Sequence, residues 1–119
     1  MLSNPRPGES QAGEDMLYMV YGVDGPDGPR IRDAMRDEHF QYLEDNSEIM
    51  VLGGATLADA DDTRTGSLLI INVPDRAAAD AFADHEPFRK AGLFKEVTVR
   101  RMRRGQWYPE NAPGGAEGD

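Results

Sequence analysis

The apolar residues of this chain gather in four short runs that are separated by polar segments. These runs predict β-strands at residues 16–23, 49–52, 67–73 and 94–102. In two of the intervening segments apolar residues recur three to four positions apart, which predicts helices at residues 30–46 and 75–84. The order strand, helix, strand, strand, helix, strand is that of the split βαβ motif. It predicts an α+β, ferredoxin-like domain (βαββαβ) with a four-stranded antiparallel sheet and two helices on one of its faces.

Turn-forming residues support the boundaries of these elements. The segment 24–29 (DGPDGP) closes the first predicted strand, and the pair Gly53 and Gly54 is expected to end the second. Asp75 stands where it can cap the N-terminus of the second predicted helix. Residues 85–88 (HEPF) follow that helix and are expected to form a break before the last strand.

The two ends of the chain differ in composition from its centre. Residues 1–15 are rich in Pro, Gly, Ser and acidic residues, and we expect a disordered leader there. Met16 begins the first apolar run, which leaves open whether this leader is an upstream start or a cloning remnant. Residues 109–119 (PENAPGGAEGD) are expected to be a flexible tail. The functional domain is therefore expected at residues 16–108.

The composition excludes several kinds of site and of binding partner. The chain has no cysteine, which excludes disulfides, zinc thiolate sites and cysteine nucleophiles and is typical of a cytoplasmic protein. A net charge of −9 repels phosphate backbones, so we expect no nucleic acid partner. No apolar run approaches the roughly 20 residues that cross a bilayer, so no membrane partner is expected. The basic residues at 100–104 are interpreted as a solvated strand end rather than an anion site.

The predicted strands are apolar on both faces, and this predicts a second copy of the chain. Residues 16–23 (MLYMVYGV) and 67–73 (SLLIINV) place apolar side chains at both odd and even positions. Two helices can cover only one face of the sheet. We therefore expect a homodimer through sheet-to-sheet packing. In the alternative, the tails fold back over the open face, but they are polar and glycine-rich.

His39 is the first candidate for chemistry. On a helical wheel with 100° per residue it lies within about 40° of Met35 and Leu43, in the centre of the apolar stripe. A buried imidazole needs a partner or a ligand, because burying it unpaired is costly. Arg36 lies about 60° away, and it could hold an anionic substrate group. The alternatives are a histidine that is satisfied within the core and an arginine in a surface salt bridge.

The other candidates lie after the second helix and at the start of the third strand. A carboxylate at Glu86, beside His85, could orient an imidazole across a pocket, although such a pair before a proline is also a simple helix end. We expect no metal site from His39, His85 and Glu86, because adjacent residues rarely point at one ion. Ser67 lacks a nucleophile elbow and is expected to contribute a ligand hydrogen bond at most. Phosphate-loop, dinucleotide-binding and HExxH motifs are absent, so we expect no cofactor.

Five segments of the chain together form a family pattern. They are 17–21 (LYMVY), 36–39 (RDEH), 52–55 (LGGA), 66–68 (GSL) and 86–94 (EPFRKAGLF). This pattern resembles the YciI-like family over about residues 16–104. The resemblance implies the fold of the dimeric α+β barrel superfamily and a pocket between helices and sheet, with His39 and an acid as its active centre. The family's usual residue before the proline is Asp, whereas this chain has Glu86, whose longer side chain has to reach His39.

The resemblance also implies a range of functions. Relatives in the superfamily include muconolactone isomerase-like enzymes, a dehydrochlorinase-like branch and cofactor-free monooxygenases, and the fold alone does not choose among them. The first hypothesis is a cofactor-independent enzyme that performs His-mediated acid/base chemistry (isomerase, lyase or dehydrochlorinase type) on a small cyclic or aromatic metabolite. In it His39 and Glu86 are catalytic, and Arg36, Ser67 and His85 bind substrate. The second is a non-catalytic, small-ligand-binding or accessory homodimeric module, and the third is a structural oligomer with a vestigial pocket.

Overall fold

A computed structural model describes residues 15–115 of the chain. Its elements are β1 (Met16–Asp24), α1 (Gly28–Asp45), the 3₁₀ turn η1 (Ser47–Ile49), β2 (Met50–Leu57), β3 (Arg64–Val73), α2 (Arg76–His85), α3 (Pro87–Lys90), β4 (Phe94–Met102) and the 3₁₀ turn η2 (Pro109–Asn111). The predicted leader lies outside the described residues apart from Asp15, and so do residues 116–119 of the predicted tail.

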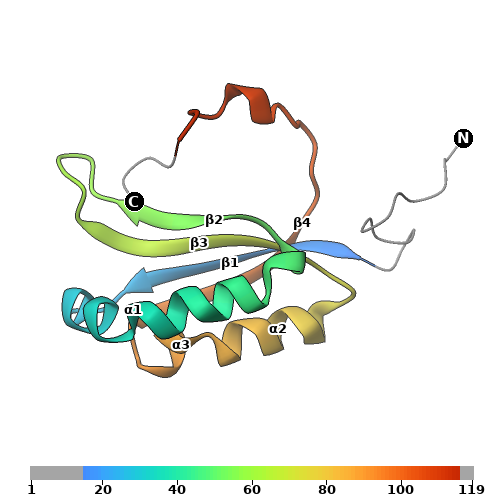
Figure 1. Cartoon of the computed structure of the whole chain (residues 1–119). Coiled ribbons are helices and arrows are strands. Elements are labelled where there is room, and N and C mark those ends of the chain that lie inside the picture. Colours follow the sequence, from blue (N-terminus) through green and yellow to red (C-terminus); the bar gives the residue numbers. More distant parts are fainter. Residues whose placement is uncertain (1–14, 116–119) are drawn as a thin grey trace, which may run out of the picture.

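The four strands form one antiparallel sheet in the order β2-β3-β1-β4. The earliest strand, β1, lies inside the sheet and pairs with both β3 and β4. All three helices lie on the same side of this sheet (Figure 1). The predicted α+β, ferredoxin-like fold is therefore confirmed.

The main core lies between the sheet and α2. Its buried members alternate along β1 and β3, as expected of strands with one face against helices, and they meet small and aromatic residues of α2. They are Tyr18, Val20, Leu69, Ile71, Val73, Ala79, Phe82 and Ala83. A second cluster of Ile31, Phe88 and Leu93 joins α1 to α3. Asp75 caps α2 as predicted, because its side chain accepts a hydrogen bond of 2.8 Å from the Ala78 N–H.

The second strand does not end at Gly53 and Gly54, so the predicted boundary was wrong. β2 runs on to Leu57 and keeps its pairing with β3 through both glycines, Gly53 opposite Leu69 and Gly54 opposite Leu68. A Cβ atom at Gly53 would lie 2.8 Å from Leu69 Cδ2. The glycine therefore allows a close approach within the sheet, and the ladder outweighs its weak preference for strands.

The segment after α2 is not a plain break, and here too the prediction was wrong. Residues 87–90 form the short helix α3, with Pro87 in its first turn and Glu86 as its N-cap. Proline is favoured at the first position of a helix, because its missing N–H would have no partner there. The same residues that end α2 therefore begin α3.

On the face of the sheet opposite the helices, β1 and β3 present apolar side chains that the described chain leaves uncovered, whereas β4 places Glu96, Thr98 and Arg100 on the same face. Leu17, Met19 and Tyr21 of β1 and Leu68 and Ile70 of β3 are half-buried there, out of phase with the buried core positions. Residues 103–115 are exposed throughout, and none belongs to either core cluster. The described part of the tail therefore does not pack over this face.

Among residues 15–115, no helix has the length and apolar character needed to span a membrane.

Candidate functional site

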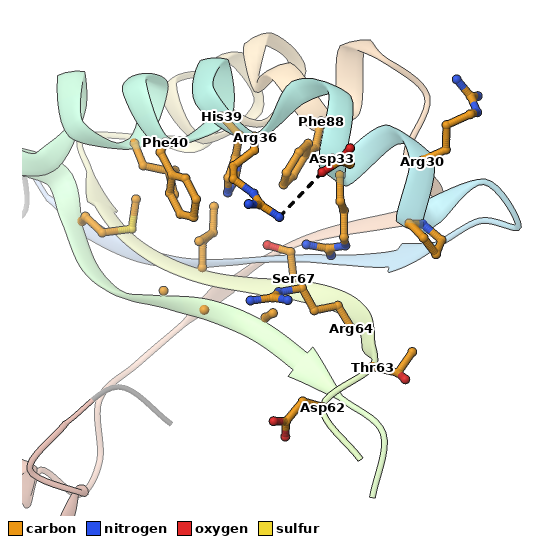
Figure 2. Close-up of a pocket in the computed structure, with 18 residues that line it drawn as sticks. Arg30, Asp33, Arg36, His39, Phe40, Asp62, Thr63, Arg64, Ser67 and Phe88 are labelled. Atoms are coloured by element: carbon orange, nitrogen blue, oxygen red, sulfur yellow. Dashed lines mark ion pairs between the residues drawn. The ribbon is translucent and has the colours of Figure 1, made fainter. Parts of the chain in front are cut away.

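An open groove of about 1240 Å³ lies between α1 and the strands β2 and β3. Figure 2 shows His39, Arg36 and Phe88 on the helical side of this groove, with Ser67 on the strand opposite. Four arginines and two aspartates line it together with apolar residues and glycines. The charged lining residues are Arg30, Arg32, Arg36, Arg64, Asp33 and Asp62. Its wall is therefore richer in positive charge than the chain as a whole, whose net charge is −9.

His39 and Glu86 form a buried pair at the inner wall of this groove. His39 Nδ1 lies 2.7 Å from Glu86 Oε2 across a separation of 47 residues, and the two side chains are only 10% and 6% exposed. α1 supplies the histidine and the N-cap of α3 supplies the carboxylate. The longer side chain of Glu86 therefore reaches the imidazole.

The surroundings of the pair favour one tautomer of the His39 imidazole. Glu86 Oε2 also accepts the Phe88 N–H at 3.0 Å, so this oxygen is placed by the first turn of α3. If His39 donates from Nδ1 to this carboxylate, its Nε2 becomes the basic nitrogen. Nε2 has no hydrogen-bond partner within residues 15–115. Every buried side-chain nitrogen in that range has a partner, so Nε2 is not fully buried and is accessible to solvent. Since His39 lines the groove, that opening is the groove.

Arg32 is a groove residue that the sequence reasoning missed. Its Nε and Nη2 donate to the two carboxylate oxygens of Asp24 at 2.8 and 2.9 Å, and Nη2 also donates to the Gly66 carbonyl at 2.8 Å. The wheel centred on His39 could have found it, because Arg32 lies about 20° away, closer than Arg36. Its partner Asp24 was interpreted only as turn chemistry.

Arg36 and Ser67 both line the groove, as the sequence reasoning required. Arg36 is exposed and makes only a long contact of 4.0 Å with Asp33 (dashed in Figure 2). Its guanidinium is therefore weakly held. Ser67 is buried on the helical face of β3, beneath the groove. The structure brings these two residues and His39 around one space, but their roles toward a substrate stay predictions.

The structure does not bring His85 to this site, contrary to its expected place beside the substrate. Its side chain is exposed, and its Nδ1 lies 2.7 Å from the Ala81 carbonyl, one turn back in α2. It is not among the residues that line the groove. The physical reason is that α2 ends at His85, whose side chain stays on the helix surface, while the extended backbone of Glu86 directs its carboxylate to the N-terminus of α3.

Electrostatic effects and metal-binding potential complete the site. Burial, followed by the negative charge of Glu86, raises the pKa of Tyr42, whose hydroxyl donates to the Phe82 carbonyl at 2.8 Å. Hydrogen bonds from Thr63 lower the pKa of Asp61 in the exposed loop between β2 and β3. In the described part of the chain no three His, Cys, Asp or Glu side chains converge as a metal site.

Comparisons with known proteins relate the chain to one family and one fold. Residues 16–103 match the YCII-related domain family. The chain is 30% identical over 96 residues to protein YciI of Escherichia coli O6:H1, with 75% of this chain and 98% of that protein covered. Among solved structures it is similar to 5-chloro-2-hydroxyhydroquinone dehydrochlorinase (TftG) of Burkholderia phenoliruptrix AC1100 in complex with 2,5-dihydroxybenzoquinone. That match has a TM-score of 0.71 and 32% identity, and covers 76% of this chain and 96% of TftG. PA3566 of Pseudomonas aeruginosa shares the fold at 12% identity and a TM-score of 0.50, over 82% and 100% of the two chains.

Proposed function

Because the chain belongs to the YCII-related family, we propose that it is a cofactor-independent enzyme in which His39 performs acid/base chemistry on a small cyclic or aromatic metabolite. The observation that carries this proposal is the buried contact of 2.7 Å between His39 Nδ1 and Glu86 Oε2 beside an open groove. A carboxylate on one ring nitrogen makes the other nitrogen a better base and stabilises the imidazolium that forms.

Similarity to TftG favours the dehydrochlorinase type within this class. That protein is named for removing chloride from a chlorinated trihydroxybenzene, and its structure holds a dihydroxybenzoquinone. The groove is lined by apolar residues, arginines and His39, and this combination suits a flat ring with ionisable hydroxyl groups. We therefore take a halogenated or hydroxylated aromatic ring as the substrate class.

A single base can carry out the whole reaction. His39 Nε2 takes the proton of a ring hydroxyl and returns it to the carbon that bears chlorine, which moves the double bonds and creates a ketone. It then takes a second hydroxyl proton. The electron pair of that O–H bond forms a second C=O bond, and a ring double bond shifts to the carbon that bears chlorine. Chloride then leaves with the electron pair of the C–Cl bond. The net change is loss of HCl, so neither an oxidant nor a reductant is needed.

Chloride release from 5-chloro-2-hydroxyhydroquinone tests this proposal. We expect turnover by the wild type and a loss of kcat of about 10²- to 10⁴-fold in His39→Gln, since that is the usual contribution of a general base. His85→Gln is the matched control, because it changes an exposed histidine outside the groove. No chloride release above buffer, or an unchanged kcat in His39→Gln, would contradict the proposal.

A second candidate is a non-catalytic module that binds a small ligand in the same groove. The observation that favours it is the N-cap contact of 3.0 Å between Glu86 Oε2 and the Phe88 N–H. This contact gives Glu86 a structural use that is independent of catalysis. A ligand that binds tightly without turnover, equally in the wild type and in Glu86→Gln, would support the binding module.

We also propose that the chain works as a homodimer through sheet-to-sheet packing. The support is the apolar part of the sheet face opposite the helices, formed by β1 and β3, which includes Leu17, Met19 and Ile70. Leu52 extends this surface onto β2 and is 63% exposed. An apolar face of this kind is costly to leave in water, and a second copy would cover it.

A further inference from the structure

We infer that Arg32 anchors an anionic oxygen of the substrate, either an ionised ring hydroxyl or a carboxylate. This inference rests on the proposed function of the groove, because it names the substrate class that His39 would meet. The residue in question is not Arg36, which the sequence pattern favoured, but the arginine one turn earlier in α1.

The hydrogen bonds of Arg32 leave one side of its guanidinium available. Nε and Nη2 supply three N–H groups to Asp24 and the Gly66 carbonyl, at 2.8 to 2.9 Å. Nη1, with two further N–H groups, has no partner within residues 15–115. Since no buried side-chain nitrogen in that part lacks a partner, Nη1 is accessible, and Arg32 lines the groove.

The guanidinium is fixed before any ligand arrives. Arg32 is 13% exposed and Asp24 is 8% exposed, so the bidentate pair is shielded from solvent. Both carboxylate oxygens and one backbone carbonyl determine the plane of the guanidinium. A ligand therefore does not have to order a long, flexible side chain, and a preorganised donor binds more tightly for that reason.

The anchor and the base contact one common ring. The guanidinium carbon of Arg32 lies 5.2 Å from the centroid of the Phe88 ring, and the imidazole of His39 stacks on that ring at 3.9 Å. Arg32 and His39 therefore both border Phe88, and we expect a substituted aromatic ring in the groove to reach both. An oxygen held at Nη1 would fix which other atom of the ring meets His39.

Charge also favours an anion at this place. Asp24 compensates the charge of Arg32 from behind and does not line the groove, so the pair presents its positive end to the ligand. Arg36 on α1 and Arg64 on β3 add positive charge to the same groove. Arg32 as a purely structural link between α1 and the sheet is the alternative. That role would give no preference among ligands.

The binding of anionic and neutral probes distinguishes an anion anchor from a purely structural link. The three probes are 2,5-dihydroxybenzoquinone, whose hydroxyls are as acidic as carboxylic acids and ionised at neutral pH, its 2,5-dimethoxy ether, which cannot ionise, and benzoate. Each is titrated by calorimetry. We expect the wild type to prefer an anionic probe over the ether by about tenfold or more, as charged hydrogen bonds usually allow. Arg32→Lys and Arg32→Gln should lose this preference, with ether binding unchanged. Arg76→Gln is the control, because Arg76 pairs with Asp80 on the exposed side of α2.

A second measurement avoids the risk that a variant misfolds with Asp24 left unpaired. Side-chain ¹⁵N spectra of the wild-type arginines, recorded during the same titrations, should show the Arg32 resonances moving with an anionic probe and not with the ether. Movement with the quinone points to a ring hydroxyl, and movement with benzoate points to a carboxylate. Unmoved Arg32 resonances with both anions, or an equal affinity for all three probes, would overturn the inference.

The failure of this inference can be told from failure of the proposed function. Probe binding needs no turnover, whereas the proposed function depends on chloride release and its loss in His39→Gln. Chloride release with an unchanged KM in a folded Arg32→Lys would refute the anchor alone. An anion preference that depends on Arg32 in a protein without turnover would refute the enzyme alone.

Discussion

The imidazole of His39 lies almost flat against the phenyl ring of Phe88, with centroids 3.9 Å apart and planes inclined by 15°. The backbone N–H of Phe88 also binds the carboxylate oxygen that contacts His39. The first turn of α3 therefore supplies both a ring that orients the imidazole and the placement of its acid partner. This four-residue helix was expected to be a break.

Substitutions of Phe88 should distinguish its contribution to core packing from its role in orienting the His39 imidazole. Phe88→Ala removes a buried ring, and we expect the free energy of unfolding to fall by about 3–5 kcal/mol. Phe88→Leu keeps more of the volume and should cost less, but it also removes the stack on His39. We therefore expect kcat for chloride release to fall in both variants, while denaturant unfolding shows the larger loss in Phe88→Ala. A wild-type kcat in Phe88→Leu would show that the stack does not orient the base.

The proton of the neutral His39 imidazole should reside on Nδ1. A carboxylate at 2.7 Å accepts a hydrogen bond and favours the tautomer that donates to it. Imidazole ¹⁵N spectra, recorded where the ring is neutral, should show a protonated Nδ1 and an unprotonated Nε2. Glu86→Ala removes the acceptor and should weaken this preference. The exposed His85 provides an internal reference, and a dominant Nε2–H tautomer at His39 would contradict the proposed base.

The homodimer can be tested at an exposed position of the open face. We expect Leu52→Asp to give a monomer by light scattering at micromolar concentration, because it places a charge in an apolar interface. Leu52 is 63% exposed in the single chain, so the fold itself should survive the change. Phe40→Asp is the matched control, since Phe40 is 59% exposed on the helical side. A monomeric wild type, or dimers that persist in Leu52→Asp, would contradict sheet-to-sheet packing.

Alkaline stability should depend on Tyr42. Burial and the charge of Glu86 raise the pKa of this residue in the folded state, so folding favours its protonated form. The resulting stabilisation is complete below the unfolded pKa of about 10 and declines as pH rises from there through the folded pKa. The free energy of unfolding should therefore fall more steeply above about pH 10 in the wild type than in Tyr42→Phe. Tyr108→Phe, at an exposed site, should follow the wild type, and parallel curves for wild type and Tyr42→Phe would contradict the prediction.

Local periodicity predicted the elements and the direction of single side chains well. The last strand was predicted at its observed bounds, and His39 is buried on α1 as its wheel position required. The same reasoning was wrong where pairing or capping overrides propensity. Gly53 and Gly54 stay in β2 because β3 pairs with them, and residues 87–90 become a helix because Glu86 caps it.

The choice between neighbouring polar residues could not be made from the sequence. His85 and Glu86 are adjacent, yet one is exposed on α2 and the other is buried beside His39. Arg32 and Arg36 both face the groove, but only Arg32 finds a buried carboxylate, Asp24, at the end of β1. Glu86 depends on a partner 47 residues away, and Arg32 on Asp24 and the Gly66 carbonyl, which are brought to it by the ends of β1 and β3.

The sequence by itself determined the βαββαβ order, two strands (β1 and β3) that are apolar on both faces and a histidine in a buried stripe, because these follow from spacings of two and of three to four residues. Only the tertiary structure decided that Glu86, 47 residues away, reaches His39, and that Arg32 is fixed at the groove. The physical reason is that such contacts depend on how α1, α3 and the strand ends pack together. Their distances are set by the volumes of buried side chains between the elements, and no local periodicity encodes those distances.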